Sequence, residues 1–282
     1  MNPINFVPKQ PFMVKVSLNY YKYVFGRYGI SHFYSFKVED HVDKFEISVP
    51  DGCIDFNISY TADGEYVGAN FYGTDLSPHA MKCYKNCHYF GMRFLPGCTP
   101  VFANISMAEM IDKMVPYEEV ALIEDLPQLI VQKKDFMAQI QCFLKQYMRF
   151  YNDKTSSKEI LMSGLIKEII VNYGNISVGQ LSEETNYSIS YLDKMFKNEI
   201  GISPKKFSNI IRFQYLLNRI SCGADIFEEM NINSLMLNLG YYDQAHMIHD
   251  FKKFANLTPN QYVVELYNMN YNQRLKIIDK KP

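Results

Sequence analysis

Up to about residue 126, hydrophobic and polar positions alternate with a period of two. The clearest runs are rich in aromatic or β-branched side chains and cover residues 45–49, 54–60 and 89–94. Such runs, bounded by turn residues, predict half-buried β-strands. Pro50-Asp51-Gly52 and Ala62-Asp63-Gly64 are turn signals, and the second is expected to close a hairpin. We therefore expect a small β-sandwich or barrel in residues 1–125.

After these strands the pattern becomes helical. A short helix is expected over Ile105–Met114, and a long one over Gln128–Tyr151. The apolar positions of the long helix, spaced almost as a heptad seam, are Leu129, Phe136, Ile140, Phe143 and Tyr147. This stripe could form a dimer contact or pack on the protein's own β-domain. Residues 152–157 read as a linker, and a further helix is expected over Ser157–Tyr173.

Two helices joined by a tight turn are predicted between residues 177 and 197. Ser177 and Gln180 have capping-box spacing, Asn186 suits a left-handed turn, and Ser188 caps the second helix. The second helix would bury Leu192, Met195 and Phe196. Its outer side, open to a DNA groove, would carry Ile189, Ser190, Asp193, Lys194 and Lys197. This pattern is a helix-turn-helix.

A second turn and helix follow about fifty residues later. Gly240 suits a turn with positive φ, and Asp243 is placed as the N-cap. Met247, Phe251 and Phe254 would face inward. The outer side would carry side chains suited to base edges and phosphates, namely Gln244, Ala245, Ile248, His249 and Lys252. Alone, this stretch would read as an ordinary surface helix.

Similar sequences at the ends of the two units indicate that the units are duplicates. Gly201-Ile202-Ser203-Pro204 ends the first unit, and Asn256-Leu257-Thr258-Pro259 ends the second. Between them, Pro204–Ile220 forms one apolar-striped helix of roughly 25 Å. Recognition helices that enter successive major grooves lie about 34 Å apart. A rigid linker helix can set that distance.

Residues 177–266 resemble the DNA-binding domain of AraC/XylS-type transcription regulators, in which a long helix joins two helix-turn-helix units. The resemblance is carried by Tyr191-Leu192, Phe196-Lys197, Gly201 to Pro204, Phe207, Arg212, Gly240-Tyr241, Asp243-Gln244, His246, Phe251-Lys252 and Thr258-Pro259. It implies base contacts from Ser190, Asp193 and Lys194 in the first unit, and from Gln244, Ala245, Ile248 and His249 in the second. For Arg212 it favours a structural role over a base contact.

The second unit departs from the family's pattern at Met236, Met247 and Ala255-Asn256. Methionine fills irregular gaps and asparagine tolerates left-handed φ, so we expect the fold to survive. His249 stands where arginine is common, and a neutral imidazole is the weaker contact. We therefore expect the first unit to contribute more of the affinity.

The order of residues 50–55 and 91–97 resembles the N-terminal sensor-type domain of one branch of the same family. The resemblance covers roughly residues 49–120 and leaves the effector unknown. Within it, Arg93 and Asp55 could bind a polar effector inside the β-domain. We favour structural pairing of both residues.

Composition allows two domains with real cores: 282 residues, net charge −1 and 48% hydrophobic residues. Between residues 187 and 219 the charge is locally basic. Six basic residues, Lys194, Lys197, Lys205, Lys206, Arg212 and Arg219, outnumber Asp193 and Glu199. No run of about eighteen apolar residues and no signal peptide is evident, so we expect a cytoplasmic protein without membrane contact.

Cysteine placement raises a different class of function. Cys83 and Cys87, near His79, His88 and Cys98, could hold a metal or sense oxidants, and AraC-like domains also occur joined to zinc-thiolate DNA-repair methyl acceptors. The spacing is not C-x-x-C, and four close thiolates are not evident. We therefore expect reduced, buried cysteines, no cofactor or metal, and no enzyme activity.

The predicted architecture is α+β. It comprises a β-rich sensor or association domain (1–125), a helical connector (126–174), a double helix-turn-helix DNA-binding domain (175–270) and a tail (271–282). The expected partner is double-stranded DNA, with RNA polymerase, a small effector and a second copy of the chain as further candidates.

Overall fold

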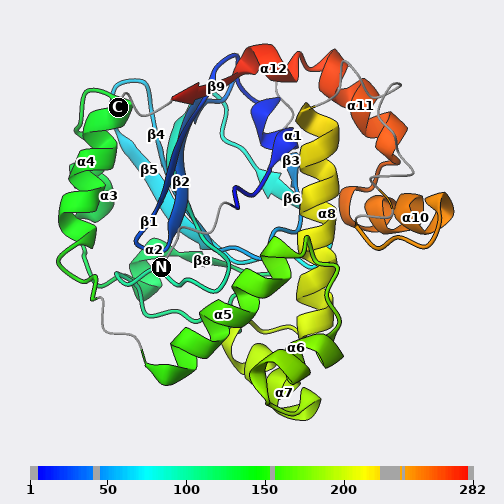
Figure 1. Cartoon of the computed structure of the whole chain (residues 1–282). Helices are drawn as coiled ribbons and strands as arrows, with labels where there is room; N and C mark the ends of the chain where they lie inside the picture. The colour runs from blue at the N-terminus through cyan, green and yellow to red at the C-terminus, as the bar shows by residue number, and fades with distance from the viewer. Residues whose placement is uncertain (1–5, 41–44, 153–155, 223–235, 237–238, 279–282) are drawn as a thin grey trace.

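The computed structural model describes residues 6–40, 45–152, 156–222, 236 and 239–278. Its N-terminal part is built of strands, as the alternation predicts (Figure 1). They are β1 (Tyr20–Arg27), β2 (Ile30–Lys37), β3 (Phe45–Ser48), β4 (Asp55–Tyr60), β5 (Tyr66–Tyr72), β6 (His79–Lys82), β7 (His88–Phe94) and β8 (Met114–Pro116). The three runs of alternating residues correspond to β3, β4 and β7. The expected hairpin turn lies between β4 and β5, with Gly64 at φ +84°.

These strands form two sheets. The main sheet has seven strands in the order β8-β5-β4-β7-β2-β1-β9, and β3 pairs with β6 separately. Within the main sheet every neighbouring pair is antiparallel except β1 and β9. The expected β-rich domain is therefore confirmed.

The two faces of the main sheet differ in chemistry. On one face, Phe33 of β2 and Phe90 of β7 pack against Phe143 and Phe136 of the following helices. On the other face lie six buried polar side chains: Lys22, His32, Tyr34, Asp55, Asn57 and Arg93. The N-terminal segment covers this polar face, since Lys22 Nζ donates to the Pro8 carbonyl at 3.1 Å. Short helix α1 (Pro11–Val14) continues that segment.

Two helix predictions in the connecting region are wrong. Residues 107–112 form turns, and the chain then pairs with β5 from Met114 as β8. Met107 and Met110 are nevertheless buried. The long helix expected over 128–151 is interrupted at residues 132–135, where Asp135 accepts a hydrogen bond from Ala138 N and starts a new helix. The helices are α2 (Tyr117–Val120), α3 (Leu126–Val131) and α4 (Phe136–Tyr147).

The apolar stripe of α4 packs on the protein's own β-domain. Ile140, Phe143 and Tyr147 are buried, and the Tyr147 hydroxyl donates to the Tyr28 carbonyl at 2.8 Å. Of the two alternatives for this stripe, intramolecular packing is the one observed.

The C-terminal part is helical, and one of its helices joins the two units. The helices are α5 (Ser157–Val171), α6 (Val178–Thr185), α7 (Ile189–Glu199), α8 (Pro204–Cys222), α10 (Gln244–Ala255), α11 (Pro259–Asn268) and α12 (Tyr271–Arg274). Residues 153–155 of the predicted linker lie outside the described residues. Among the helices that the structure describes, none is long and apolar enough to cross a membrane.

The segment predicted as a tail is instead part of the fold. Residues 275–278 form β9, which pairs in parallel with β1 from Tyr20 to Tyr23 (Figure 1). Arg274 Nη1 donates to the carbonyls of Lys15 and Ser17 at 3.0 and 2.9 Å, which holds the strand in place. The four-residue strand is too short to show a reliable alternation, so sequence pattern did not reveal it.

Removal of residues 275–282 is expected to expose the backbone edge of β1. Loss of the β1–β9 hydrogen bonds should lower the free energy of unfolding by about 1–3 kcal/mol and accelerate hydrogen exchange at residues 20–23. Removal of residues 279–282 alone, the matched control, should leave exchange in β1 unchanged. Equal exchange in the two truncated proteins would show that β9 does not protect the edge.

Candidate nucleic-acid interface

The first helix-turn-helix is built as its sequence predicts. Ser177 and Gln180 form the reciprocal capping box at the start of α6, and Asn186 takes a left-handed conformation with φ 58°. Ser188 then accepts a hydrogen bond from Tyr191 N at 3.2 Å and caps α7. Each turn residue therefore satisfies free backbone groups at a helix end.

The face of α7 opposite its core is available to a partner. Leu192, Met195 and Phe196 are buried. On the opposite side, the expected contact residues Ile189, Ser190, Lys194 and Lys197 are exposed and Asp193 is half-buried. Lys197 Nζ lies 2.6 Å from an Asp193 oxygen, one helical turn away. The structure thus brings all five predicted residues to one side of α7.

The second unit repeats this arrangement in α10. Asp243 accepts a hydrogen bond from His246 N at 2.7 Å, and Met247, Phe251 and Phe254 are buried. The helix ends at Asn256 with φ 57°, so asparagine supplies the left-handed residue that glycine supplies in the first unit. The expectation that these departures leave the fold intact is confirmed for the described residues. The segment before the turn, residues 223–235 and 237–238, lies outside them.

The predicted contact residues of α10 also share its outer face. Gln244, Ala245, His249 and Lys252 are exposed, and Ile248 is half-buried. The imidazoles of His246 and His249 lie 3.6 and 3.9 Å from Asp250 oxygens. This carboxylate reduces the positive potential of α10, whereas the exposed ammonium of Lys194 on α7 forms no ion pair with any residue that the structure describes.

Three tyrosines on the same faces were missed by sequence reasoning. Tyr187 directly precedes the cap of α7, and Tyr242 directly precedes the cap of α10. Tyr242 is 93% exposed, while Tyr187 is 43% exposed and stacks on Tyr191 with ring centres 4.8 Å apart. Their matching positions relative to the two caps could have identified the first two in the sequence.

A buried contact joins the segment before α6 in the first unit to the turn of the second unit. Arg212 of α8 donates through Nη2 to the Gly174 carbonyl at 3.1 Å, and its guanidinium lies 5.3 Å from the centre of the Tyr241 ring. Gly240, with φ +69°, packs so closely that a Cβ there would lie 2.0 Å from Asn175 Oδ1. Arg212 is thus buried and bonded within the fold, which agrees with the structural role favoured for it.

Linker helix α8 also contacts the N-terminal domain. Gln214 is 2% exposed, accepts from Lys9 N at 2.8 Å, and donates to the Lys9 and Pro50 carbonyls at 3.2 and 2.8 Å. Next to it, Gly52 lies against Phe207 of α8, where a Cβ would come within 2.9 Å of the ring. The loop of residues 50–52 therefore rests directly on α8.

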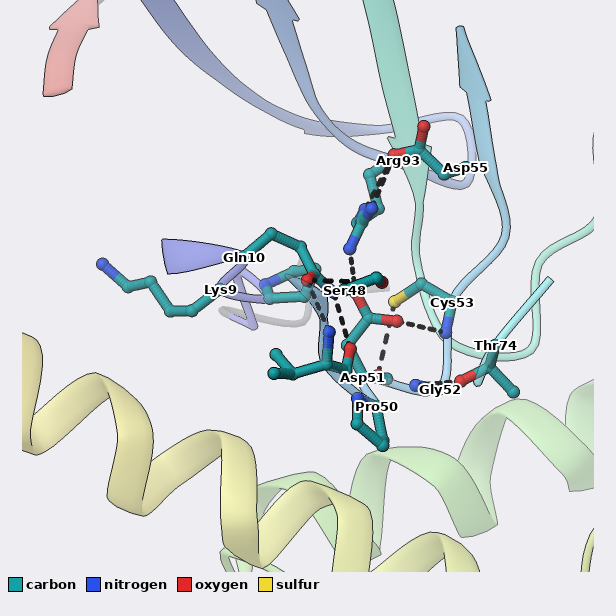
Figure 2. Close-up of polar contacts among 12 residues, drawn as sticks. Lys9, Gln10, Ser48, Pro50, Asp51, Gly52, Cys53, Asp55, Thr74 and Arg93 are labelled. Carbon is teal, nitrogen blue, oxygen red and sulfur yellow. Dashed lines mark hydrogen bonds and ion pairs between the residues drawn. The ribbon is translucent and has the colours of Figure 1, made fainter. Parts of the chain in front are cut away.

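The same loop is tied to a buried ion cluster (Figure 2). Asp51 pairs with Arg93 and accepts from Gln10 Nε2 at 3.0 Å, while Arg93 Nε donates to Asp55 at 2.8 Å. Burial raises the pKa of Asp55, although Arg93 opposes that shift. Burial lowers the pKa of Arg93, but Asp51 and Asp55 outweigh it and raise the value above the usual range. Arg93 and Asp55 are thus paired structurally, as favoured from the sequence.

The cysteine region offers little support for thiolate chemistry. Cys83 and Cys87 are buried, and burial raises the pKa of Cys87, which disfavours its thiolate. Within the described ranges, no group of three or more His, Cys, Asp or Glu side chains is arranged to hold a metal ion. The zinc-thiolate and redox alternatives are not supported.

Two family models match the chain. Residues 181–264 match a helix-turn-helix domain, and residues 28–116 match a domain of unknown function, DUF6597. The first match covers α7, α8 and α10, and the second covers most of the main sheet.

Curated relatives are helix-turn-helix regulators by name. An uncharacterized HTH-type transcriptional regulator of Staphylococcus aureus (strain N315) is 23% identical over 163 residues, or 55% of this chain and 20% of that protein. One from Haemophilus influenzae is 28% identical over 88 residues, or 30% of this chain and 27% of that protein. The chain thus spans about a fifth to a quarter of the length of these relatives.

Two solved structures show limited similarity to this chain. ToxT from Vibrio cholerae is 12% identical, with a TM-score of 0.42 over 82% of this chain and 96% of that one. The C-terminal domain of AraT, a response regulator from Geobacillus stearothermophilus, is 22% identical, with a TM-score of 0.34 over 45% of this chain and 94% of that one.

Substitution of Gly240 by alanine is expected to lower the free energy of unfolding by about 1–3 kcal/mol. The substitution forces a left-handed alanine and presses its Cβ against Asn175. In a double-mutant cycle read by chemical denaturation, Asn175→Ala should recover the part due to the clash. Additive effects of the two substitutions would show that Gly240 and Asn175 are not in contact.

Proposed function

Given that the chain is an AraC/XylS-type regulator by its C-terminal helix-turn-helix domain, we propose that the whole protein is a sequence-specific DNA-binding transcription regulator. It inserts α7 and α10 into successive major grooves. The observation that carries the proposal is the repetition of one design. Each helix follows a capped turn, buries one face and presents the other, and α8 joins the two units.

Equivalent positions on the two helices define the base-reading residues. The caps Ser188 and Asp243 are fifty-five residues apart, so Ile189 corresponds to Gln244, Ser190 to Ala245, and Lys194 to His249. We assign base contacts to Ser190, Asp193 and Lys194 in α7, and to Gln244, Ala245, Ile248 and His249 in α10. Lysine suits guanine and glutamine suits adenine, whereas alanine and isoleucine suit the thymine methyl.

Phosphate contacts fall to the remaining basic residues and the exposed tyrosines. Lys197 and Lys252 occupy corresponding positions in the two helices, with Lys197 held beside Asp193. Tyr187 and Tyr242 directly precede the caps of α7 and α10, and their hydroxyl groups can donate a hydrogen bond to a phosphate oxygen. Residues 187–219 carry six basic against two acidic residues, so the first unit contributes more affinity than α10, where Asp250 lies beside both histidines.

The N-terminal domain regulates this activity through α8. Gln214 bonds to Lys9 and Pro50, and Gly52 rests on Phe207. A change in the 50–52 loop therefore reaches the helix that sets the spacing of α7 and α10. The effector or partner that causes such a change acts on the N-terminal domain.

Random-sequence selection with the purified full chain tests the proposed function. We expect enrichment of a bipartite site whose halves lie about one helical turn, or 10–10.5 base pairs, apart. No enrichment, or a single half-site bound as tightly as two, would contradict the insertion of two helices.

Alanine substitution separates residues that read bases from those that contact phosphate. Lys194→Ala and Gln244→Ala should each reduce discrimination between selected and altered sites by about 1–3 kcal/mol. Lys197→Ala, the control, should weaken binding to all sequences and reduce the salt slope by about one. These quantities are measured by DNA titration at several salt concentrations. Unchanged sequence preference would remove Lys194 or Gln244 from the interface.

Gln214→Met is expected to loosen the contact between the N-terminal domain and α8. It leaves Lys9 N–H and two carbonyls without their partner, at a cost of about 1–3 kcal/mol in unfolding free energy. Hydrogen exchange should increase at residues 9–10 and 50–52, and the affinity for selected DNA should change. Lys205→Ala, an exposed control on the same helix, should leave hydrogen exchange at both segments unchanged. Unchanged exchange at both segments would show that Gln214 does not couple them.

A further inference from the structure

A cleft of about 420 Å³ lies between the N-terminal domain and the first helix-turn-helix. Its floor is apolar and consists of the buried residues Leu95, Met107, Met162 and Ile166. The rim is formed by the β1–β2 hairpin, by α5 and by the last residues of α7. The volume and the apolar lining are those of a small-molecule site.

The cleft is held open by contacts on either side of it. Gly97 touches α5 so closely that a Cβ would lie 2.3 Å from Ile166 Cδ1. Gly201, just after α7, packs against Ala108 and Ile111 in the same way. Lys158 of α5 pairs with Glu199 of α7 at the rim. Because these contacts fix the surrounding backbone, the cleft is largely preformed.

Charge at the rim selects the kind of ligand. Glu159 and Glu199 line the cleft, against one guanidinium, that of Arg27. The carboxyl end of α7 lies at the same rim, since Asn198 and Glu199 line it, and the helix dipole adds a partial negative charge there. Lys158 is exposed and makes only a surface ion pair with Glu199, so a bound cation can displace it.

We propose that this cleft binds an amphipathic organic cation. Its apolar body lies on the two thioethers of Met107 and Met162, and its ammonium group lies between Glu159 and Glu199. Methionine side chains adapt to the shape of such a body. Since Asn198 and Glu199 are the last residues of recognition helix α7, the ligand contacts the element that reads DNA. Binding of the cation to the cleft does not depend on the proposed function. Only the effect of the cation on DNA affinity rests on that function.

Three probes of equal length test the site on the full chain: hexylamine, hexanoate and 1-hexanol. Titration followed by calorimetry or NMR should show hexylamine binding at least tenfold more tightly than hexanoate, with hexanol between them. Equal affinity for the three, tighter binding of hexanoate, or no binding of hexylamine would overturn the proposal.

Two substitutions link any binding to this cleft. Met162→Trp fills the floor and should abolish binding of hexylamine. Glu159→Gln keeps the capping box, because glutamine serves at that position, and should lower the preference for hexylamine over hexanoate at least threefold. Glu159→Gln keeps the test valid if Met162→Trp fails to fold. Unchanged hexylamine binding in both folded variants would place the ligand elsewhere.

DNA titration with and without hexylamine tests the regulatory consequence separately. Saturating hexylamine should change the dissociation constant for selected DNA at least threefold in the parent protein and not in Met162→Trp. Binding of hexylamine with no such change would reject the regulatory role while the site stands. A protein that binds hexylamine but no DNA would instead reject the proposed function.

Discussion

The arrangement of the N-terminal domain and the two helix-turn-helix units depends on the packing of α8, which is buried against different partners along its length. Phe207 meets the 50–52 loop, Arg212 reaches Gly174 and Tyr241, and Gln214 bonds to Lys9 and Pro50. One helix therefore packs in the core of both helix-turn-helix units and against the surface of the N-terminal domain. A buried glutamine or arginine left without its partners would be costly, so these contacts specify one arrangement of the domains.

The two units are attached to the rest of the protein by different means. At the end of the first unit, Gly201 packs against Ala108 and Ile111, and Gly97 lies near Ile200. Helix α5 contacts the same unit through the ion pair of Lys158 with Glu199. The second is held through Gly240 on one side and through α11 and α12 on the other, where Glu265 pairs with Lys15 and Tyr262 meets Phe12. The two units are therefore attached to the rest of the protein through separate sets of contacts.

Local chemistry made the helix-turn-helix units predictable from sequence. Capping residues such as Ser177, Ser188 and Asp243 act within three or four positions, and the structure places them as expected. Long-range contacts were the part that sequence could not supply. The turns at residues 107–112 and the burial of Gln214 involve segments distant in the chain. The interruption at residues 132–135 instead coincides with a local cap, Asp135, that the helical pattern did not reveal. The ion cluster was predicted only in part. Buried charges are expected to pair, which predicts the contact of Arg93 with Asp55, but the sequence did not indicate that Asp51 joins them.

The parallel pairing of β9 with β1 also determines when the main sheet can be complete. Residues 20–23 leave the ribosome about 250 residues before residues 275–278, their partners in the sheet. Until the last segment arrives, the β1 edge has open backbone groups, and an open edge invites pairing with other chains. Contacts between such distant segments also form slowly. The main sheet can therefore close only after both helix-turn-helix units have been synthesised.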